Sequence, residues 1–169
     1  MYRYKTRKNK NRIQKIFYNN IEENFGTAII LAGPNVRNAV KFVKNIAKNI
    51  ISYEIDPATY LKQKKFSTRS LKFKLGDIAS AEAVNFIDAD LMKTMETNYG
   101  RISDLLKKQS NLEGKKVFIG TTSMRSCSKR TTIKFLKCIL YNILKEYDLE
   151  YYTYADREGP MFTFKITYL

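Results

Sequence analysis

The stretch Thr27–Asn35, TAIILAGPN, is a short apolar run that ends abruptly in Gly-Pro-Asn. Residues 28–31 are apolar without alternation, which is typical of a strand covered on both faces in a parallel sheet. Gly33 allows a sharp turn, and Pro34 then fixes φ and has no N–H to place. The stretch therefore predicts a buried strand that stops at a tight turn.

Asn35 is a favourable N-cap for a helix, which the spacing of apolar residues predicts over 36–48. A strand, a glycine turn and a helix N-terminus together offer backbone N–H groups to a small molecule at the end of the strand. Similar units follow along the chain. The pattern predicts further strands over 50–56, 71–77, 84–91 and 117–122, and helices over 58–65, near 102–112 and over 133–144.

The C-terminal part breaks this alternation. Residues 150–155 and 161–169 are aromatic and β-branched, and the segment 157–160 between them contains Gly and Pro. This pattern predicts an antiparallel hairpin. The fold class is therefore α/β, with a Rossmann-like, mostly parallel sheet, a C-terminal antiparallel hairpin and helices on both faces.

The N-terminal part begins with a basic tail. Residues 1–12 hold six Lys or Arg and no acid. Apolar residues at helical spacing then predict a helix from Ile13, with Gly26 as its C′ residue. The expected organisation is a tail, 1–12, followed by a single domain, 13–169.

The composition limits the chemistry. The chain of 169 residues has a net charge of +15, which favours a nucleic-acid partner over an anionic membrane or an acidic protein. It contains no His, which excludes His-dependent nucleophile systems and His-based zinc sites. Cys127 and Cys138 have no metal-ligand spacing, and no signal peptide or bilayer-spanning stretch is evident, so we expect a reducing, intracellular setting without membrane insertion.

The order of the strand ends resembles that of the class I S-adenosylmethionine-dependent methyltransferases, over residues 27–169. The similar segments are LAGPN (31–35), YEID (53–56), LGDI (75–78) and NFIDADL (85–91). The resemblance implies S-adenosylmethionine as the cofactor, with Glu54 on the ribose hydroxyls and Asp77 on the adenine amine. The cofactor-binding residues that it implies are Ala32, Gly33, Pro34, Asn35, Glu54, Ile55, Asp77, Ile78 and Asp88.

The resemblance places the methyl acceptor beside the fourth of these segments. Asp88 and Asp90 are the candidate catalytic residues, because either could orient or deprotonate an acceptor nitrogen or hydroxyl. Alternatively, Asp88 binds the methionine end of the cofactor and Asp90 caps the following helix. Metal-dependent relatives have a further carboxylate or amide after the fifth strand, where this chain has Thr121 and Thr122, so we predict no metal.

The predicted function is methyl transfer from S-adenosylmethionine to nucleic acid. The residues expected to bind nucleic acid are Arg3, Lys5, Arg7, Lys8, Lys10, Arg125, Lys129 and Arg130. The loop 121–132 that carries the last three is equally compatible with a polar helix cap. Because only Gly33 remains of the family's glycine-rich motif, a non-catalytic protein that binds nucleic acid or a protein partner is the alternative. A third hypothesis is an enzyme that consumes the cofactor itself.

Overall fold

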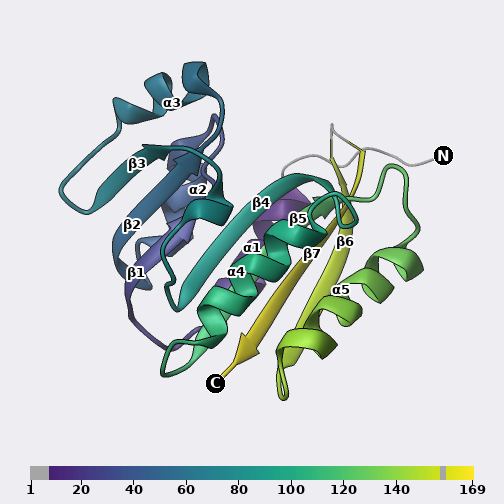
Figure 1. Ribbon diagram of the computed structural model, residues 1–169. Helices are drawn as coiled ribbons and strands as arrows, with labels where there is room; N and C mark the ends of the chain where they lie inside the picture. The colour runs from purple at the N-terminus through teal and green to yellow at the C-terminus, as the bar shows by residue number, and fades with distance from the viewer. Residues whose placement is uncertain (1–7, 157–158) are drawn as a thin grey trace.

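The structure, a computed structural model, describes residues 8–156 and 159–169, so the predicted arm residues Arg3, Lys5 and Arg7 lie outside the described residues. The described chain forms one seven-stranded sheet with helices on both faces, shown in Figure 1. The strands are β1 (Phe25–Ile30), β2 (Ala47–Glu54), β3 (Leu71–Leu75), β4 (Phe86–Thr94), β5 (Lys116–Ser123), β6 (Asp148–Asp156) and β7 (Gly159–Tyr168). The helices are α1 (Lys8–Asn19), α2 (Val36–Val43), α3 (Pro57–Lys64), the short η1 (Ile78–Ser80), α4 (Tyr99–Ser110) and α5 (Lys129–Ile143).

The strand order across the sheet is β3-β2-β1-β4-β5-β7-β6. Strands β1 to β5 pair in parallel, whereas β7 runs antiparallel to both β5 and β6. The order reverses between β1 and β4, which places the topological switch point of the sheet at their carboxyl ends. The predicted fold class, with its parallel sheet and terminal hairpin, is confirmed.

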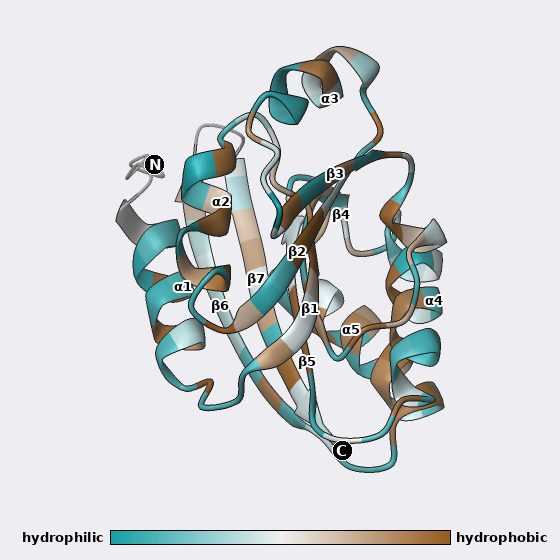
Figure 2. Ribbon diagram, turned by 90° about the vertical axis from the view of Figure 1, so that its left-hand side faces the viewer, coloured by the Kyte–Doolittle hydropathy of each residue, from teal (hydrophilic) through white to brown (hydrophobic). Residues whose placement is uncertain are grey.

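Two hydrophobic cores lie on opposite faces of the sheet. Figure 2 shows α1 and α2 on one face and α4 and α5 on the other. The first core includes Phe17, Val43 and Phe86, and the second includes Leu106, Phe118 and Leu140. Strands buried from both sides explain the apolar runs that the sequence carries without alternation.

Side-chain caps fix where three helices begin. Asn35 accepts a hydrogen bond from the backbone N–H of Asn38 at the start of α2, as predicted. Asp56 caps α3 in the same way, with Pro57 at the first helical position. Ser128 caps α5. Each cap satisfies an N–H that has no partner inside its helix.

Several predicted boundaries are wrong, among them that of the last helix, α5, which begins at Lys129 rather than at 133, and that of β4, which extends to Thr94 rather than ending at 91. The helix predicted over 36–48 ends at Val43, and β2 begins at Ala47, because apolar residues at 46 and 47 also suit a strand covered on both faces. Gly26 does not end the first helix but lies within β1. Helix α1 begins at Lys8, so residues 8–12 of the predicted tail are helical.

One close backbone approach lies between β5 and β7. Gly120 pairs with Phe164 in the antiparallel register. An added Cβ at Gly120 would lie 2.3 Å from Cζ of the Phe164 ring, which is fully buried. Phe164 in turn stacks against Phe118, with ring centroids 6.0 Å apart. Only glycine therefore leaves room for this ring in the core.

Candidate functional site

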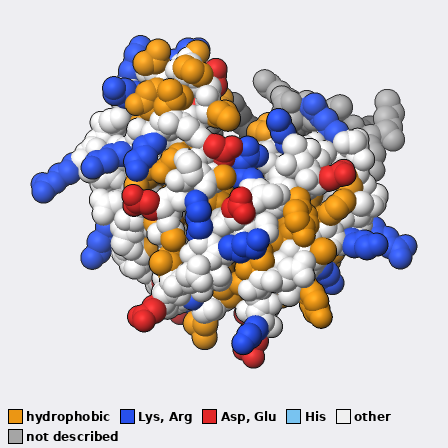
Figure 3. Space-filling model, in the orientation of Figure 1, with side chains coloured by type: hydrophobic (Ala, Val, Ile, Leu, Met, Phe, Trp, Pro, Cys, Tyr) orange, Lys and Arg blue, Asp and Glu red, His pale blue; other side chains and the backbone are white. Residues whose placement is uncertain are grey.

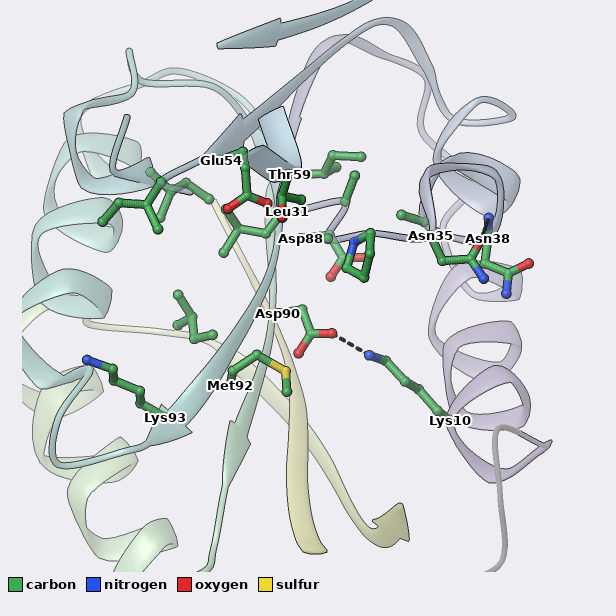
Figure 4. Close-up of a pocket in the computed structure, with 18 of the residues that line it drawn as sticks. Lys10, Leu31, Asn35, Asn38, Glu54, Thr59, Asp88, Asp90, Met92 and Lys93 are labelled. Atoms are coloured by element: carbon green, nitrogen blue, oxygen red, sulfur yellow. Dashed lines mark hydrogen bonds and ion pairs between the residues drawn. The ribbon is translucent and has the colours of Figure 1, made fainter. Parts of the chain in front are cut away.

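A cavity of about 750 Å³ opens at the carboxyl ends of β1, β2 and β4, where the strand order reverses. Figure 4 shows side chains from these strands and from α1 and α2 around it. The cavity brings together all nine predicted cofactor-binding residues and both predicted catalytic residues. Those in its wall are Ala32, Gly33, Pro34, Asn35, Glu54, Ile55, Asp77, Ile78, Asp88 and Asp90, together with Lys10.

The turn after β1 forms one wall of the cavity. Gly33 has a φ of +58°, which the absence of a Cβ permits, and no atom outside its immediate chain neighbours lies within 4 Å of the position a Cβ would take. The turn is held from both sides. The backbone N–H of Ala32 donates to Oγ of Ser52 at 3.1 Å, and Nε2 of Gln63 donates to the carbonyl of Gly33 at 2.7 Å. The backbone at Gly33 therefore faces open space, so a bound ligand can come into close contact with it.

Glu54, at the end of β2, is oriented by two hydrogen bonds. Its Oε1 accepts from the backbone N–H of Asp56 at 3.0 Å, and its Oε2 accepts from Nε2 of Gln63 at 3.1 Å. Gln63 is fully buried and also holds the Gly33 turn, so one side chain couples the two predicted cofactor segments. A carboxylate has about four acceptor positions, and Glu54 keeps two for a ligand.

Asp77, at the end of β3, is held by Arg101 of α4. The guanidinium donates to both carboxylate oxygens, at 2.9 and 2.6 Å, and the backbone N–H of Ala79 donates to Oδ1. The hydrogen bonds from Arg101 lower the pKa of Asp77, so its carboxyl stays ionised. Three acceptor positions are thus occupied, which leaves room for one further donor such as an amino group.

Asp88 of β4 is partly buried and contacts Tyr18 of α1. The Tyr18 hydroxyl donates to Oδ2 of Asp88 at 2.5 Å. Burial raises the pKa of Asp88 to about 6, against the hydrogen bond from Tyr18, which favours the charged form. Burial also raises the pKa of Tyr18, so the phenol remains a proton donor at neutral pH. The site thus contains a carboxyl that titrates close to neutral pH.

Asp90, two residues further along β4, forms an ion pair with Lys10 of α1 through Oδ2. Figure 4 shows the two groups pointing toward one another at the cavity wall. The other oxygen, Oδ1, is buried and has no hydrogen-bond partner within the described part of the chain. Asp90 does not cap the next helix, because Asn98 occupies that position. The alternative role predicted for Asp90 is therefore wrong.

Two features that the sequence did not indicate lie at or near this end of the cavity, namely the conformation of Met92 and the contacts that α1 makes with β4. Met92 has a φ of +38°, rare outside glycine, where the pairing of β4 with β5 shifts register between Asp90 and Thr94. Tyr18 and Lys10 come from α1, 70 and 80 positions away from their carboxylate partners. No local motif marks such contacts, since only the tertiary fold brings them together.

Replacing Asp88 with Asn should stabilise the fold in a pH-dependent way. The folded pKa of about 6 exceeds the ordinary value of 3.8, so the wild type loses stability as the pH rises from about 4 to about 6. Asn does not titrate and still accepts the Tyr18 hydrogen bond. At pH 7 we expect a gain on the order of 3 kcal/mol, which shrinks toward pH 4. Thermal unfolding of both proteins across this range measures it. A stability difference that does not vary with pH would contradict the raised pKa of Asp88 in the folded protein.

The loop 121–132 is built as a helix cap. Ser128 caps α5, and β5 extends to Ser123, which leaves few loop residues free. Arg125, Lys129 and Arg130 do not line the cavity. Lys10 belongs to the cavity, paired with Asp90, and Lys8 lies in the first turn of α1. Among the predicted basic residues, Lys10 is thus placed in the cavity wall.

Residues 8–156 and 159–169 contain neither a cluster of metal-binding side chains nor a membrane-spanning helix. No group of three or more His, Cys, Asp or Glu side chains in these residues could hold a metal ion, and both cysteines are free thiols. None of the helices found there is both long and apolar enough to cross a membrane.

No protein-family model and no curated protein matches the sequence. Solved structures do match the fold. The N-methyltransferase NodS from Bradyrhizobium japonicum WM9 superposes with a TM-score of 0.66 at 10% identity, covering 94% of each chain. The magnesium protoporphyrin IX methyltransferase ChlM from Synechocystis PCC 6803, solved with bound S-adenosylmethionine, matches with a TM-score of 0.69 at 9% identity, covering 95% of this chain and 79% of ChlM.

An O-methyltransferase from Bacillus cereus, in complex with S-adenosylhomocysteine, matches with a TM-score of 0.65 at 10% identity, covering 98% of this chain and 83% of that protein. The chain therefore has the Rossmann-like fold of the class I S-adenosylmethionine-dependent methyltransferases. These three proteins differ in their methyl acceptors, so the fold leaves the acceptor of this chain open.

Proposed function

We propose that this protein is an S-adenosylmethionine-dependent methyltransferase that acts on nucleic acid. The observation that carries the proposal is the single cavity at the switch point, which joins the Gly33 turn, Glu54 and Asp77 to the carboxylates of Asp88 and Asp90. Its volume of about 750 Å³ accommodates a nucleoside-sized cofactor beside an acceptor group.

The residues of the cavity suit this cofactor. The two acceptor positions that Glu54 keeps match the two hydroxyls of a ribose, and the remaining position on Asp77 matches an amino group. The open space at Gly33 lets backbone approach the ligand closely. When bound, S-adenosylmethionine supplies an electrophilic methyl group on a sulfonium. The protein's main task is then to position the acceptor.

Two carboxylates serve the acceptor end of the cavity. Asp90 Oδ1, buried and without a partner in the described chain, can accept an N–H or O–H of the acceptor group. Asp88 has a pKa of about 6, which suits a group that receives a proton at neutral pH. Tyr18 fixes the orientation of that carboxyl. The net charge of +15 favours nucleic acid as the acceptor.

Calorimetric titration of the protein with S-adenosylmethionine, and separately with S-adenosylhomocysteine, tests the proposal. We expect binding in the micromolar range, followed by methyl transfer to RNA or DNA from the labelled cofactor. No binding at millimolar ligand would overturn the proposal and favour a fold that has lost its chemistry. Breakdown of the cofactor without any acceptor would instead indicate a cofactor-consuming enzyme.

A further inference from the structure

The positive charge of the chain is concentrated in one part of the fold. Residues 24–76, which form β1 to β3 with α2 and α3, hold ten Lys or Arg and two Asp or Glu. Residues 77–169 hold fourteen Lys or Arg and twelve Asp or Glu, so this part of the chain is nearly neutral. More than half of the net charge of +15 therefore lies in the half of the fold built on β1, β2 and β3. Such asymmetry indicates a polyanionic partner on that side.

Within this part, the segment 57–76 contains no acid at all. All six of its cations are exposed, and none forms an ion pair with another described residue. Figure 3 shows Lys and Arg side chains interspersed with hydrophobic ones over α3, at the upper left. We name this the α3–β3 surface; its cations are Lys62, Lys64, Lys65, Arg69, Lys72 and Lys74.

Large apolar side chains are also exposed on the α3–β3 surface and, at Ile55, immediately before it. Ile55 and Leu61 are 68% and 62% exposed, Leu75 is 51% exposed, and the ring of Phe66 is 43% exposed. In the sequence these residues have lysines between them and do not recur at helical spacing, so they do not form the apolar stripe of an amphipathic helix that inserts into a membrane. Exposed cations can bind the phosphates of a nucleic acid, and exposed aromatic and apolar side chains can contact its bases. This combination suits a single strand, whose bases are unpaired.

The α3–β3 surface borders the candidate active site at both of its ends. Before it, Glu54 and Ile55 lie in the cavity wall, and Thr59 of α3 joins them. After it, Gly76 and Asp77 return to the same wall. A strand bound along this surface is therefore led to the mouth of the cavity.

We propose that the α3–β3 surface is the docking surface for single-stranded nucleic acid, a proposal that rests on nucleic acid being the methyl acceptor. The six exposed cations bind phosphates, and Phe66 stacks on a base. The sequence had led us to expect this contact from the basic tail, 1–12, and the loop 121–132.

The test compares two triple variants with the same change in charge. The first is Lys64→Ala, Lys65→Ala and Arg69→Ala on the α3–β3 surface, and the control is Lys134→Ala, Lys137→Ala and Lys145→Ala, also exposed, on and after α5. Anisotropy of a labelled 20-nucleotide single strand measures binding across a salt series. We expect the first variant to bind about tenfold or more weakly, with a salt slope lower by about 2, and the control to bind within about twofold of wild type.

Phe66→Ala provides a second test that leaves the charge unchanged. We expect about a tenfold loss of single-strand affinity and little loss for duplex, since only unpaired bases stack on the ring. Equal losses in both triple variants, or preferential binding of the wild type to vesicles of anionic lipid, would overturn the proposal. Titration of the same variants with S-adenosylmethionine separates the docking proposal from the proposed methyltransferase function. Nucleic-acid binding can be lost while the cofactor still binds, and cofactor binding can be absent while nucleic acid still binds.

Discussion

Glu54→Ala should raise the Kd for S-adenosylmethionine at least about a hundredfold, because two hydrogen bonds to a charged acceptor are lost. Glu54 is positioned for this role at the end of β2, with Asp56 and Gln63 each occupying one position on its carboxylate. The change leaves Nε2 of Gln63 its bond to the Gly33 carbonyl, so the turn itself should persist. Isothermal titration of the variant measures the loss.

Two further variants make this result specific. Glu54→Gln keeps the shape of the side chain but removes its charge, and we expect an intermediate Kd. Glu82→Ala removes an exposed acid outside the cavity wall and should bind the cofactor as the wild type does. Unchanged affinity in Glu54→Ala, with a wild type that binds, would show that the ribose is held elsewhere and that the assignment of this carboxylate is wrong.

Gly120→Ala should destabilise the fold by about 3 kcal/mol, the upper end of the roughly 1–3 kcal/mol that overpacking of a filled core typically costs. The added methyl would lie 2.3 Å from Cζ and 2.6 Å from Cε1 of Phe164. This ring cannot move away easily, because Phe118 and Phe162 pack against it at centroid distances of 6.0 and 5.9 Å. Urea denaturation measures the change in the free energy of unfolding.

Gly100→Ala is the matched control for this variant. Gly100 lies in the first turn of α4, and apart from its chain neighbours and the backbone of its own helix no atom lies within 4 Å of the position that a Cβ would take. We expect that change to be neutral or stabilising by about 0.5–1 kcal/mol. Adding Phe164→Leu to Gly120→Ala should cost less than the two separate effects combined, because a smaller side chain relieves the overlap. Strict additivity would argue against the steric explanation.

The sequence predicted well those parts of the site that depend on local sequence patterns. Gly33, Glu54 and Asp88 are each preceded by a recognisable apolar run, and Asp77 follows a strand in which apolar and basic residues alternate. Parallel strands bring their carboxyl ends to one edge of the sheet. Their arrival in one cavity therefore follows from the strand pattern alone. The helix predicted over 36–48 failed for a related reason, because a strand buried on both faces has no period that distinguishes it from a helix.

The remaining features depend on contacts distant in the sequence. Lys10 contacts Asp90, and Tyr18 contacts Asp88, only because α1 packs against the sheet. The sequence around Lys10 and Tyr18 contains no motif that indicates a carboxylate partner. The α3–β3 surface was missed for another reason. Its cations are spread over several elements with apolar residues between them, so they form no charge run comparable to the tail at residues 1–12.

The position of β7 between β5 and β6 has a consequence for folding in the cell. All eight residues of β5 are buried in the finished sheet, yet on one side β5 pairs only with β7, which follows it by 36 positions at the nearest ends. Until β7 has been synthesised and docked, β5 presents an open apolar edge on which a second chain could pair. Expression should therefore be sensitive to temperature and chaperone supply, and variants that delay docking of β7 should accumulate as aggregates rather than as partly folded monomers.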